Sequence, residues 1–134
     1  MKKIFTCVCL IFLMGACSKV DIPVKENMLK NKSFVFLYYP TLKECLDSQA
    51  DPDFFENCHQ QVDFFRNQRV EIMLSDIYYR GNYKILGKQI VLTFPVSHEI
   101  PDGIIIFEML HPTRLLKLDN GTIWKKLSGN SIYN

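Results

Sequence analysis

The sequence predicts an all-β domain, an antiparallel meander of about eight strands that closes into a small barrel, with a short helical insert after the first strand. Two observations predict this class. Short runs of alternating apolar and polar residues recur along the chain, and turn signals such as Gly87-Lys88 and Asn120-Gly121 separate them. Strands do not alternate with helices as a parallel sheet requires. Closure into a barrel removes the exposed edges of an open sheet.

The first strand and the start of the helical insert have clear local signals. Residues 33–39 are apolar and aromatic, a composition typical of a strand, and Pro40 ends the run. Thr41 and Glu44 then have the spacing of a capping box. This spacing predicts a short helix directly after the strand.

The segment that follows is less clear. Asp51-Pro52 offers an N-cap followed by proline at the first helical position, which predicts a second short helix to about Cys58. Residues 59–69 fit two patterns, because a helical spacing of apolar residues competes with strand-like alternation. We favour a strand that ends in a polar turn, followed by a further strand at residues 70–75, where the alternation is plain.

The strongest alternation lies in residues 79–94. Gly87-Lys88 suits a two-residue turn between two paired strands. Because successive side chains point to opposite faces of a strand, one face of this hairpin should be apolar. The residues on that face are Tyr79, Tyr83 and Ile85 on the first strand and Ile90, Leu92 and Phe94 on the second.

The C-terminal third contains the last strands. Residues 104–110 form a nearly continuous apolar run, which predicts a strand buried on both faces. Asn120-Gly121 lies between two further β runs and predicts a hairpin. The β domain therefore spans residues 33–127, and residues 128–134 are expected to be a frayed terminus.

The N-terminus has the order of a signal peptide. Two lysines precede an apolar run from Ile4 to Met14, and the small residues Gly15 and Ala16 follow. The run would rise only about 16 Å as a helix, about half of the hydrocarbon thickness of a bilayer. We therefore expect residues 1–16 to be a cleaved signal and not a permanent membrane span.

The segment Leu13-Met14-Gly15-Ala16-Cys17 resembles the lipobox of bacterial lipoproteins. The resemblance implies cleavage before Cys17 and attachment of lipid to its sulfur, with residues 17–32 as a lipidated flexible tether. In such lipoproteins a residue other than aspartate after the cysteine, here Ser18, implies sorting to the outer membrane of a diderm bacterium. An ordinary secretory signal that is cut after Ala16 is the alternative.

The remaining cysteines predict a disulfide. Cys7 and Cys9 lie inside the signal and Cys17 is assigned to lipid, which leaves Cys45 and Cys58. Export to an oxidising compartment favours their pairing. Two free buried thiols are the alternative, and no Cys-x-x-Cys or comparable ligand pair predicts a metal site.

Residues 64–126 resemble the small lipocalin-like or calycin-like domains of bacterial lipoproteins. The resemblance rests on Gly81-Asn82-Tyr83-Lys84-Ile85, on the turn at Gly87, and on the segment from Asn120 to Lys126. It covers about half of the chain and implies a small antiparallel barrel. The Gly-x-Trp of true lipocalins is absent from the first strand.

The charge balance excludes one class of partner. Without Lys2 and Lys3 the chain has 14 Lys and Arg side chains against 14 Asp and Glu side chains, so the mature chain is formally neutral. A nucleic-acid-binding protein needs a basic excess or stripe. The sequence indicates neither a nucleic-acid partner nor a cofactor.

Two functional classes follow. The first is a membrane-anchored envelope binding module for a protein, glycan or lipid, in which Tyr38, Tyr79 and Tyr83 could form the binding face, although cross-strand aromatic packing also explains them. The second is an envelope hydrolase whose site assembles only in three dimensions. No nucleophile elbow, zinc motif or phosphate loop is present, and the three histidines fall at predicted turns or strand ends. This absence favours the binding module.

Overall fold

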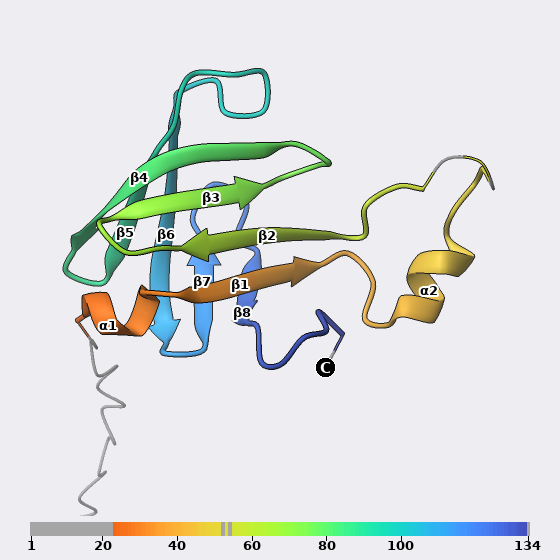
Figure 1. Cartoon of the computed structure of the whole chain (residues 1–134), viewed down its shortest axis with the longest axis horizontal. Coiled ribbons are helices and arrows are strands. Elements are labelled where there is room, and N and C mark those ends of the chain that lie inside the picture. Colours follow the sequence, from red (N-terminus) through yellow and green to blue (C-terminus); the bar gives the residue numbers. More distant parts are fainter. Residues whose placement is uncertain (1–22, 52, 54, 134) are drawn as a thin grey trace, which may run out of the picture.

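The computed structural model describes residues 23–51, 53 and 55–133, so the predicted signal and Cys17 lie outside the described residues. Each strand pairs with its neighbour in the chain, and β1 pairs with β8 to close the barrel. The predicted antiparallel eight-stranded meander is confirmed (Figure 1). The strands are β1 (Lys32–Leu37), β2 (His59–Phe64), β3 (Arg69–Met73), β4 (Tyr78–Leu86), β5 (Gln89–Thr93), β6 (Ile104–His111), β7 (Arg114–Lys117) and β8 (Ile123–Lys126).

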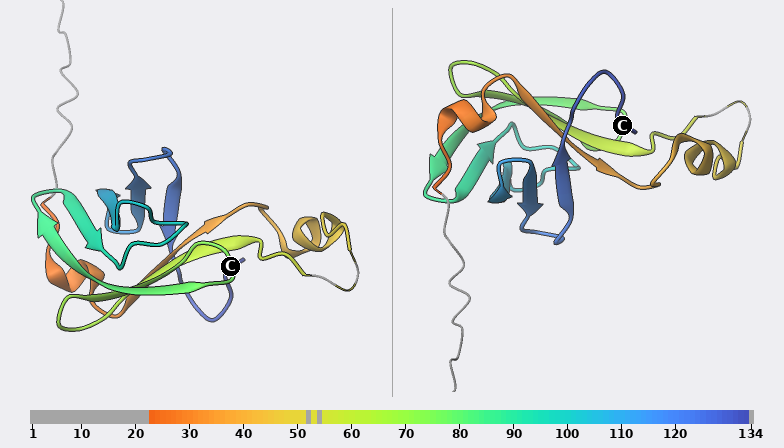
Figure 2. Two further views of the ribbon diagram at one scale, coloured as in Figure 1. Left: turned by 90° about the horizontal axis from the view of Figure 1, so that it is seen from above. Right: turned by 90° about the horizontal axis from the view of Figure 1, so that it is seen from below.

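The two ends of the barrel differ in what covers them. Helix α1 (Glu26–Leu29) lies at one end together with the β2–β3, β4–β5 and β6–β7 turns, and we call this the α1 end. The opposite end carries the β3–β4, β5–β6 and β7–β8 connections and the insert of residues 38–58 between β1 and β2, which contains helix α2 (Leu42–Asp47). We call it the insert end. Figure 2 shows the insert standing out from the barrel wall.

Side chains fill the interior of the barrel. Inward residues alternate with outward ones along the strands, as the burial pattern of β5 and β7 shows. Trp124 is fully buried, lies edge-to-face against Phe107 at 5.2 Å between ring centroids, and stacks on Phe36. The predicted apolar face of the central hairpin also points inward. The barrel is therefore a packed core, as expected for eight strands.

Gly81 lets β4 approach β5 closely. A Cβ built at this position would lie 2.2 Å from the carbonyl oxygen of Thr93 and 2.6 Å from the ring of Phe94. The Phe94 ring thus occupies the space that a side chain would take on the inward face of β4. This close approach explains the glycine in a strand that is otherwise rich in large residues.

The turns follow the predicted chemistry. Gly87 has φ +63° in the β4–β5 turn, and Gly121 has φ +71° in the β7–β8 connection. The β2–β3 turn uses Asn67 and Gln68, both with positive φ. Gly87-Lys88 is a two-residue turn, and a positive φ in such a turn matches the right-handed twist of the paired strands.

The predicted tether differs from the structure in the part that is described. Val24 is buried and its N–H donates to the carbonyl of Gly87 at 3.0 Å, while Leu29 on α1 is fully buried in the barrel core. Met28 packs against the same core. Residues 24–32 therefore close the α1 end of the barrel, and residues 17–22 of the predicted tether lie outside the described residues.

Three further predictions differ from the structure in detail. Residues 51, 53 and 55–58 of the insert contain no helix, although Asp51-Pro52 has the local signal for one. Strand β6 is buried on one face only, since Ile104 and Leu110 are 50% and 45% exposed on its outer face. The C-terminus also differs from a frayed end, because Ile132 and Tyr133 are partly buried beside Val35 of β1.

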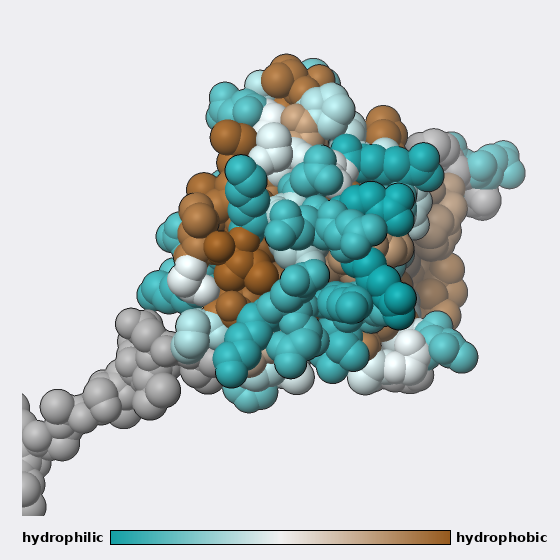
Figure 3. Space-filling model, turned by 60° about the vertical axis from the view of Figure 1, so that its left-hand side comes forward, coloured by the Kyte–Doolittle hydropathy of each residue, from teal (hydrophilic) through white to brown (hydrophobic). Residues whose placement is uncertain are grey.

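The outer wall combines apolar and polar areas. Figure 3 shows a face on which apolar residues gather beside a field of hydrophilic ones. Outward apolar side chains lie side by side there: Val91 pairs with Ile106 across β5 and β6, Leu116 pairs with Ile123 across β7 and β8, and Leu118 donates its N–H to the carbonyl of Ile106. Neither described helix has the length and apolarity needed to cross a membrane.

Candidate functional site

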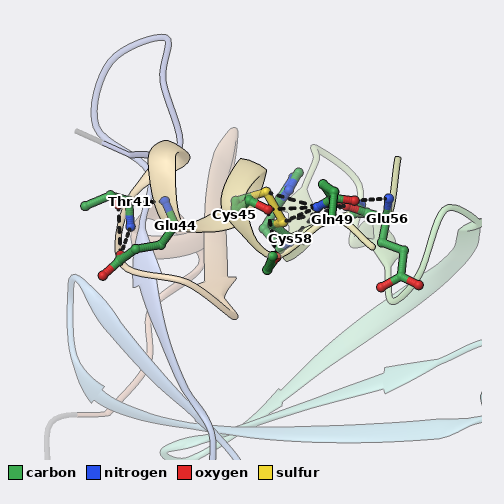
Figure 4. Close-up of a disulfide and its surroundings, with 9 residues drawn as sticks. Thr41, Glu44, Cys45, Gln49, Glu56 and Cys58 are labelled. Atoms are coloured by element: carbon green, nitrogen blue, oxygen red, sulfur yellow. Dashed lines mark hydrogen bonds between the residues drawn. A yellow bond between two sulfur atoms is a disulfide. The ribbon is translucent and has the colours of Figure 1, made fainter. Parts of the chain in front are cut away.

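A disulfide fixes the insert at the insert end of the barrel. Cys45 on α2 and Cys58, just before β2, are joined as predicted, with their Cα atoms 5.8 Å apart (Figure 4). Thr41 caps α2, since its hydroxyl accepts from the N–H of Glu44 and its own N–H donates to the Glu44 carboxylate. The predicted capping box is confirmed.

Gln49 connects the two halves of the insert. Its side-chain amide nitrogen donates to the carbonyls of Cys45 at 2.9 Å and Glu56 at 3.3 Å, and its oxygen accepts from the N–H of Glu56 at 2.7 Å (Figure 4). One amide thus satisfies backbone groups on both sides of the disulfide. These bonds hold residues 56–58 in the path that leads into β2.

The end of the insert is also attached to the barrel. The N–H of Tyr38 donates to the carbonyl of Cys58 at 2.9 Å, which extends the pairing of β1 with β2. The side-chain amide of Asn57 donates to the carbonyl of Ser75 in the β3–β4 connection at 3.1 Å. The insert therefore places Tyr38 next to two other connections of the insert end.

A cleft of about 340 Å³ opens at this place, and we call it the tyrosine cleft. It is formed by Tyr38, Glu56, Asn57, Gln60, Leu74, Ser75, Asp76 and Glu99. The hydroxyl of Tyr79 on β4 donates to the carboxylate of Glu99 at 2.7 Å, so a second tyrosine lies at its border. Gln60 is fixed by donating to the carbonyl of Leu74 at 3.0 Å.

The two tyrosines have perturbed ionisation. Burial raises the pKa of the Tyr38 hydroxyl, Gln60 lowers it by hydrogen bonding, and the charge of Glu99 raises it further. The hydrogen bond to Glu99 raises the pKa of Tyr79. Both hydroxyls therefore stay neutral at physiological pH and can donate hydrogen bonds. Glu56, Asp76 and Glu99 line the cleft, and its other lining residues are uncharged, so the cleft is acidic.

Tyr83 does not belong to this surface, which corrects one of the three predicted binding residues. Its side chain is 1% exposed and lies edge-to-face against Phe64 inside the barrel at 5.2 Å between centroids. Its hydroxyl is buried and has no hydrogen-bond partner among the described residues. Burial raises its pKa. Tyr83 is a core residue.

The histidines lie apart from one another. His59 begins β2, His98 lies in the β5–β6 connection, and His111 ends β6. Burial lowers the pKa of His59. The Nδ1 atom of His111 lies 2.8 Å from the Thr113 hydroxyl and also accepts from the N–H of Thr113, a local contact that shapes the β6–β7 turn.

These contacts do not assemble a catalytic constellation within the described residues. No histidine there forms an ion pair with a carboxylate, and the described His, Cys, Asp and Glu side chains form no cluster that could hold a metal ion. A nucleophile needs a base that is itself oriented by a third group. The described residues place exposed aromatic and acidic side chains together at the insert end.

Of the eight residues that form the cleft, only Tyr38 was predicted as a binding residue, and Gln60 and Glu99 show why the others were missed. Gln60 lies in the segment for which two patterns competed, and Glu99 lies in a connection that has no periodicity. The carboxylate of Glu99 accepts a hydrogen bond from Tyr79 on β4, 20 positions earlier, and this contact is visible only in the folded chain. No family model, curated protein or solved structure matches the chain.

Proposed function

We propose that this protein is a lipid-anchored envelope lipoprotein of a diderm bacterium, sorted to the outer membrane, whose barrel binds a partner at the tyrosine cleft. The order of charges, apolar run and small residues before Cys17 supports the anchor. The lipocalin-like resemblance of residues 64–126 supports a binding role. Because the interior is filled, binding uses the outside of the barrel and not an internal cup.

The observation that carries the binding site is the exposure of Tyr38. Its side chain is 47% exposed although it borders a cleft, and tyrosine joins a large apolar body to a hydrogen-bonding tip. Such residues are enriched at the centres of binding surfaces. Glu56, Asp76 and Glu99 add negative charge around it. The fitting partner is a protein segment with a basic side chain next to an apolar one.

The position of the cleft agrees with display from a membrane. The chain enters the barrel at the α1 end through Val24, while the cleft lies at the insert end. A lipid on Cys17 would hold the α1 end near the bilayer. The cleft would then face away from the membrane and remain open to a partner.

The test is in-cell photo-crosslinking from the lipidated protein, with an unnatural photoreactive residue in place of Asn57. We expect a crosslinked band of defined mass that weakens at least about fivefold in Tyr38→Ala, because truncation of a central aromatic residue costs more than about 1 kcal/mol of binding. Tyr78→Ala is the matched control, since Tyr78 is 55% exposed but does not line the cleft.

Two results would contradict the proposal. Equal crosslinking of Tyr38→Ala and Tyr78→Ala would remove the cleft from the binding site. Turnover of an envelope substrate that depends on one histidine or carboxylate would replace the binding module with the hydrolase.

A further inference from the structure

Charge is segregated between the two ends of the barrel. The described residues carry thirteen Lys and Arg side chains and thirteen Asp and Glu side chains. When each strand is divided at its midpoint and the Arg80–Glu71 ion pair is left out, ten of the cations and three of the carboxylates lie in the α1 half, a net charge of +7. The insert half has two cations and nine carboxylates, a net charge of −7.

A groove concentrates this positive charge at the α1 end. It has a volume of about 740 Å³ and runs between the start of β1, the β6–β7 turn and the end of β8. Lys32, Arg114, Lys125 and Lys126 line it, and its lining contains no acidic residue. We call it the basic groove.

The cations of the basic groove are held together by the sheet. Arg114 and Lys125 are direct cross-strand neighbours on β7 and β8, and the N–H of Lys126 donates to the carbonyl of Thr113 at 2.9 Å. Like charges directly opposite each other destabilise a sheet. Within the described part of the chain none of the four cations forms an ion pair. This arrangement leaves an uncompensated site for anionic groups.

The proposed anchor brings this site to a membrane. Five residues lie between Cys17 and Pro23, which is next to the first buried residue, so six Cα–Cα steps join the two. Fully extended, they span only about 20 Å. The surface of a membrane with acidic lipids is negative, and its attraction for cations acts within about one Debye length, roughly 8 Å at physiological salt. The tether is thus short enough for the α1 end to rest in that layer.

We propose that the basic groove binds the phosphate groups of anionic phospholipids, so that the α1 end lies on the bilayer and the acidic insert end points away. This inference rests on the proposed function, since the proposed anchor at Cys17 is what holds the barrel at the membrane surface. The lipid on Cys17 supplies the attachment. The basic groove supplies a second contact and fixes the orientation of the barrel.

The test uses residues 17–134 with Cys17→Ser, which lacks both lipid and signal. All core residues from Val24 to Trp124 are retained in this chain, so the barrel keeps its complete core. Near-ultraviolet circular dichroism of the single buried tryptophan, Trp124, reports that the fold is intact. Binding is measured by cosedimentation with vesicles of phosphatidylcholine alone and of phosphatidylcholine with an equal part of phosphatidylglycerol.

We expect binding to the phosphatidylglycerol vesicles only. Arg114→Gln/Lys125→Gln should lower the partition coefficient about 30-fold, the equivalent of about 1 kcal/mol for each cation at the surface. Lys43→Gln/Arg80→Gln removes the same net charge outside the basic groove and should change it less than about twofold.

Three outcomes would overturn the inference: no preference for phosphatidylglycerol, equal losses in the two double variants, or displacement by inorganic phosphate at matched ionic strength. The last would assign the groove to a free anion. None of these depends on the tyrosine cleft or on lipidation of Cys17, so failure here is distinguishable from failure of the proposed function.

Discussion

Gly81→Ala should destabilise the barrel strongly, because the space for a Cβ is already taken. The new carbon would meet the Thr93 carbonyl oxygen at 2.2 Å and the Phe94 ring at 2.6 Å, whereas Cβ contacts below 3.0 Å essentially never occur. The nearest obstacle is backbone and cannot rotate away. Strands β4 and β5 must therefore separate locally by close to an ångström.

The magnitude follows from the kind of clash. Inserting one carbon into a packed core costs about 1–3 kcal/mol, and a backbone obstacle places this site at about 3 kcal/mol. Gly87→Ala is the matched control, since it changes the same residue type in the turn of the same hairpin. A Cβ added at Gly87 would meet no heavy atom within 4 Å beyond its chain neighbours, so only the left-handed backbone contributes, about 1 kcal/mol.

The assay is equilibrium urea unfolding followed by fluorescence of Trp124, which is fully buried in the folded barrel. The difference in free energy of unfolding between the two variants should be about 2 kcal/mol. A Gly81→Ala variant no less stable than Gly87→Ala would refute the reasoning. It would mean that β4 and β5 do not approach each other as closely as described.

Three other predictions concern buried or paired groups. Tyr83→Phe should raise the free energy of unfolding by about 1 kcal/mol, because it removes a buried hydroxyl that has no described partner; a loss of stability would show that the hydroxyl is satisfied. Replacement of Cys45 and Cys58 by alanine should lower it by about 3 kcal/mol for a loop with a sequence separation of 13, and a change below about 1 kcal/mol would contradict the loop-closure argument. The raised pKa of Tyr79 contributes stability that is fully present below pH 10.0 and lost as the pH rises through the folded-state pKa. Stability should therefore fall less above that pH in Tyr79→Phe than in the wild type, and parallel pH curves would count against the bond to Glu99.

The strands were predictable where one face of the sheet is apolar. Residues 79–94 show a plain period of two because inward residues of β4 and β5 pack in the core while outward ones meet solvent. Strand β6 misled the prediction for the opposite reason, since its outer face is also apolar. A continuous apolar run in the sequence does not distinguish a strand that is buried on both faces from a strand with one exposed apolar face.

The helices depended on contacts beyond their own sequence. Helix α1 was missed because the few apolar residues from Val24 to Leu29 show no helical period, and their packing partners lie in the open end of the barrel. The second helix of the insert was predicted from Asp51-Pro52, a real capping signal. The disulfide and the hydrogen bonds of Gln49 hold the chain there in a different path.

The candidate site was only partly predictable. Tyr38 was predicted inside the first strand, whereas β1 ends at Leu37 and Tyr38 follows it directly. Tyr79 lies at the border of the cleft. The same alternation that placed Tyr79 and Tyr83 on one face explains why Tyr83 is buried, since that face points inward and only its end reaches the rim. Glu99 in the cleft and the residues of the basic groove come from segments far apart in the sequence, which lie together only in the closed barrel.

The proposed lipid attachment at Cys17 is the step on which the proposed display of the cleft and orientation of the barrel both depend. The most direct measurement is metabolic labelling with a radioactive fatty acid in a diderm host, with immunoprecipitation of the wild type and of Cys17→Ser. We predict label in the wild type and none in Cys17→Ser, with the labelled protein in the outer-membrane fraction. Equal labelling of both proteins, or no labelling of either, would contradict the account.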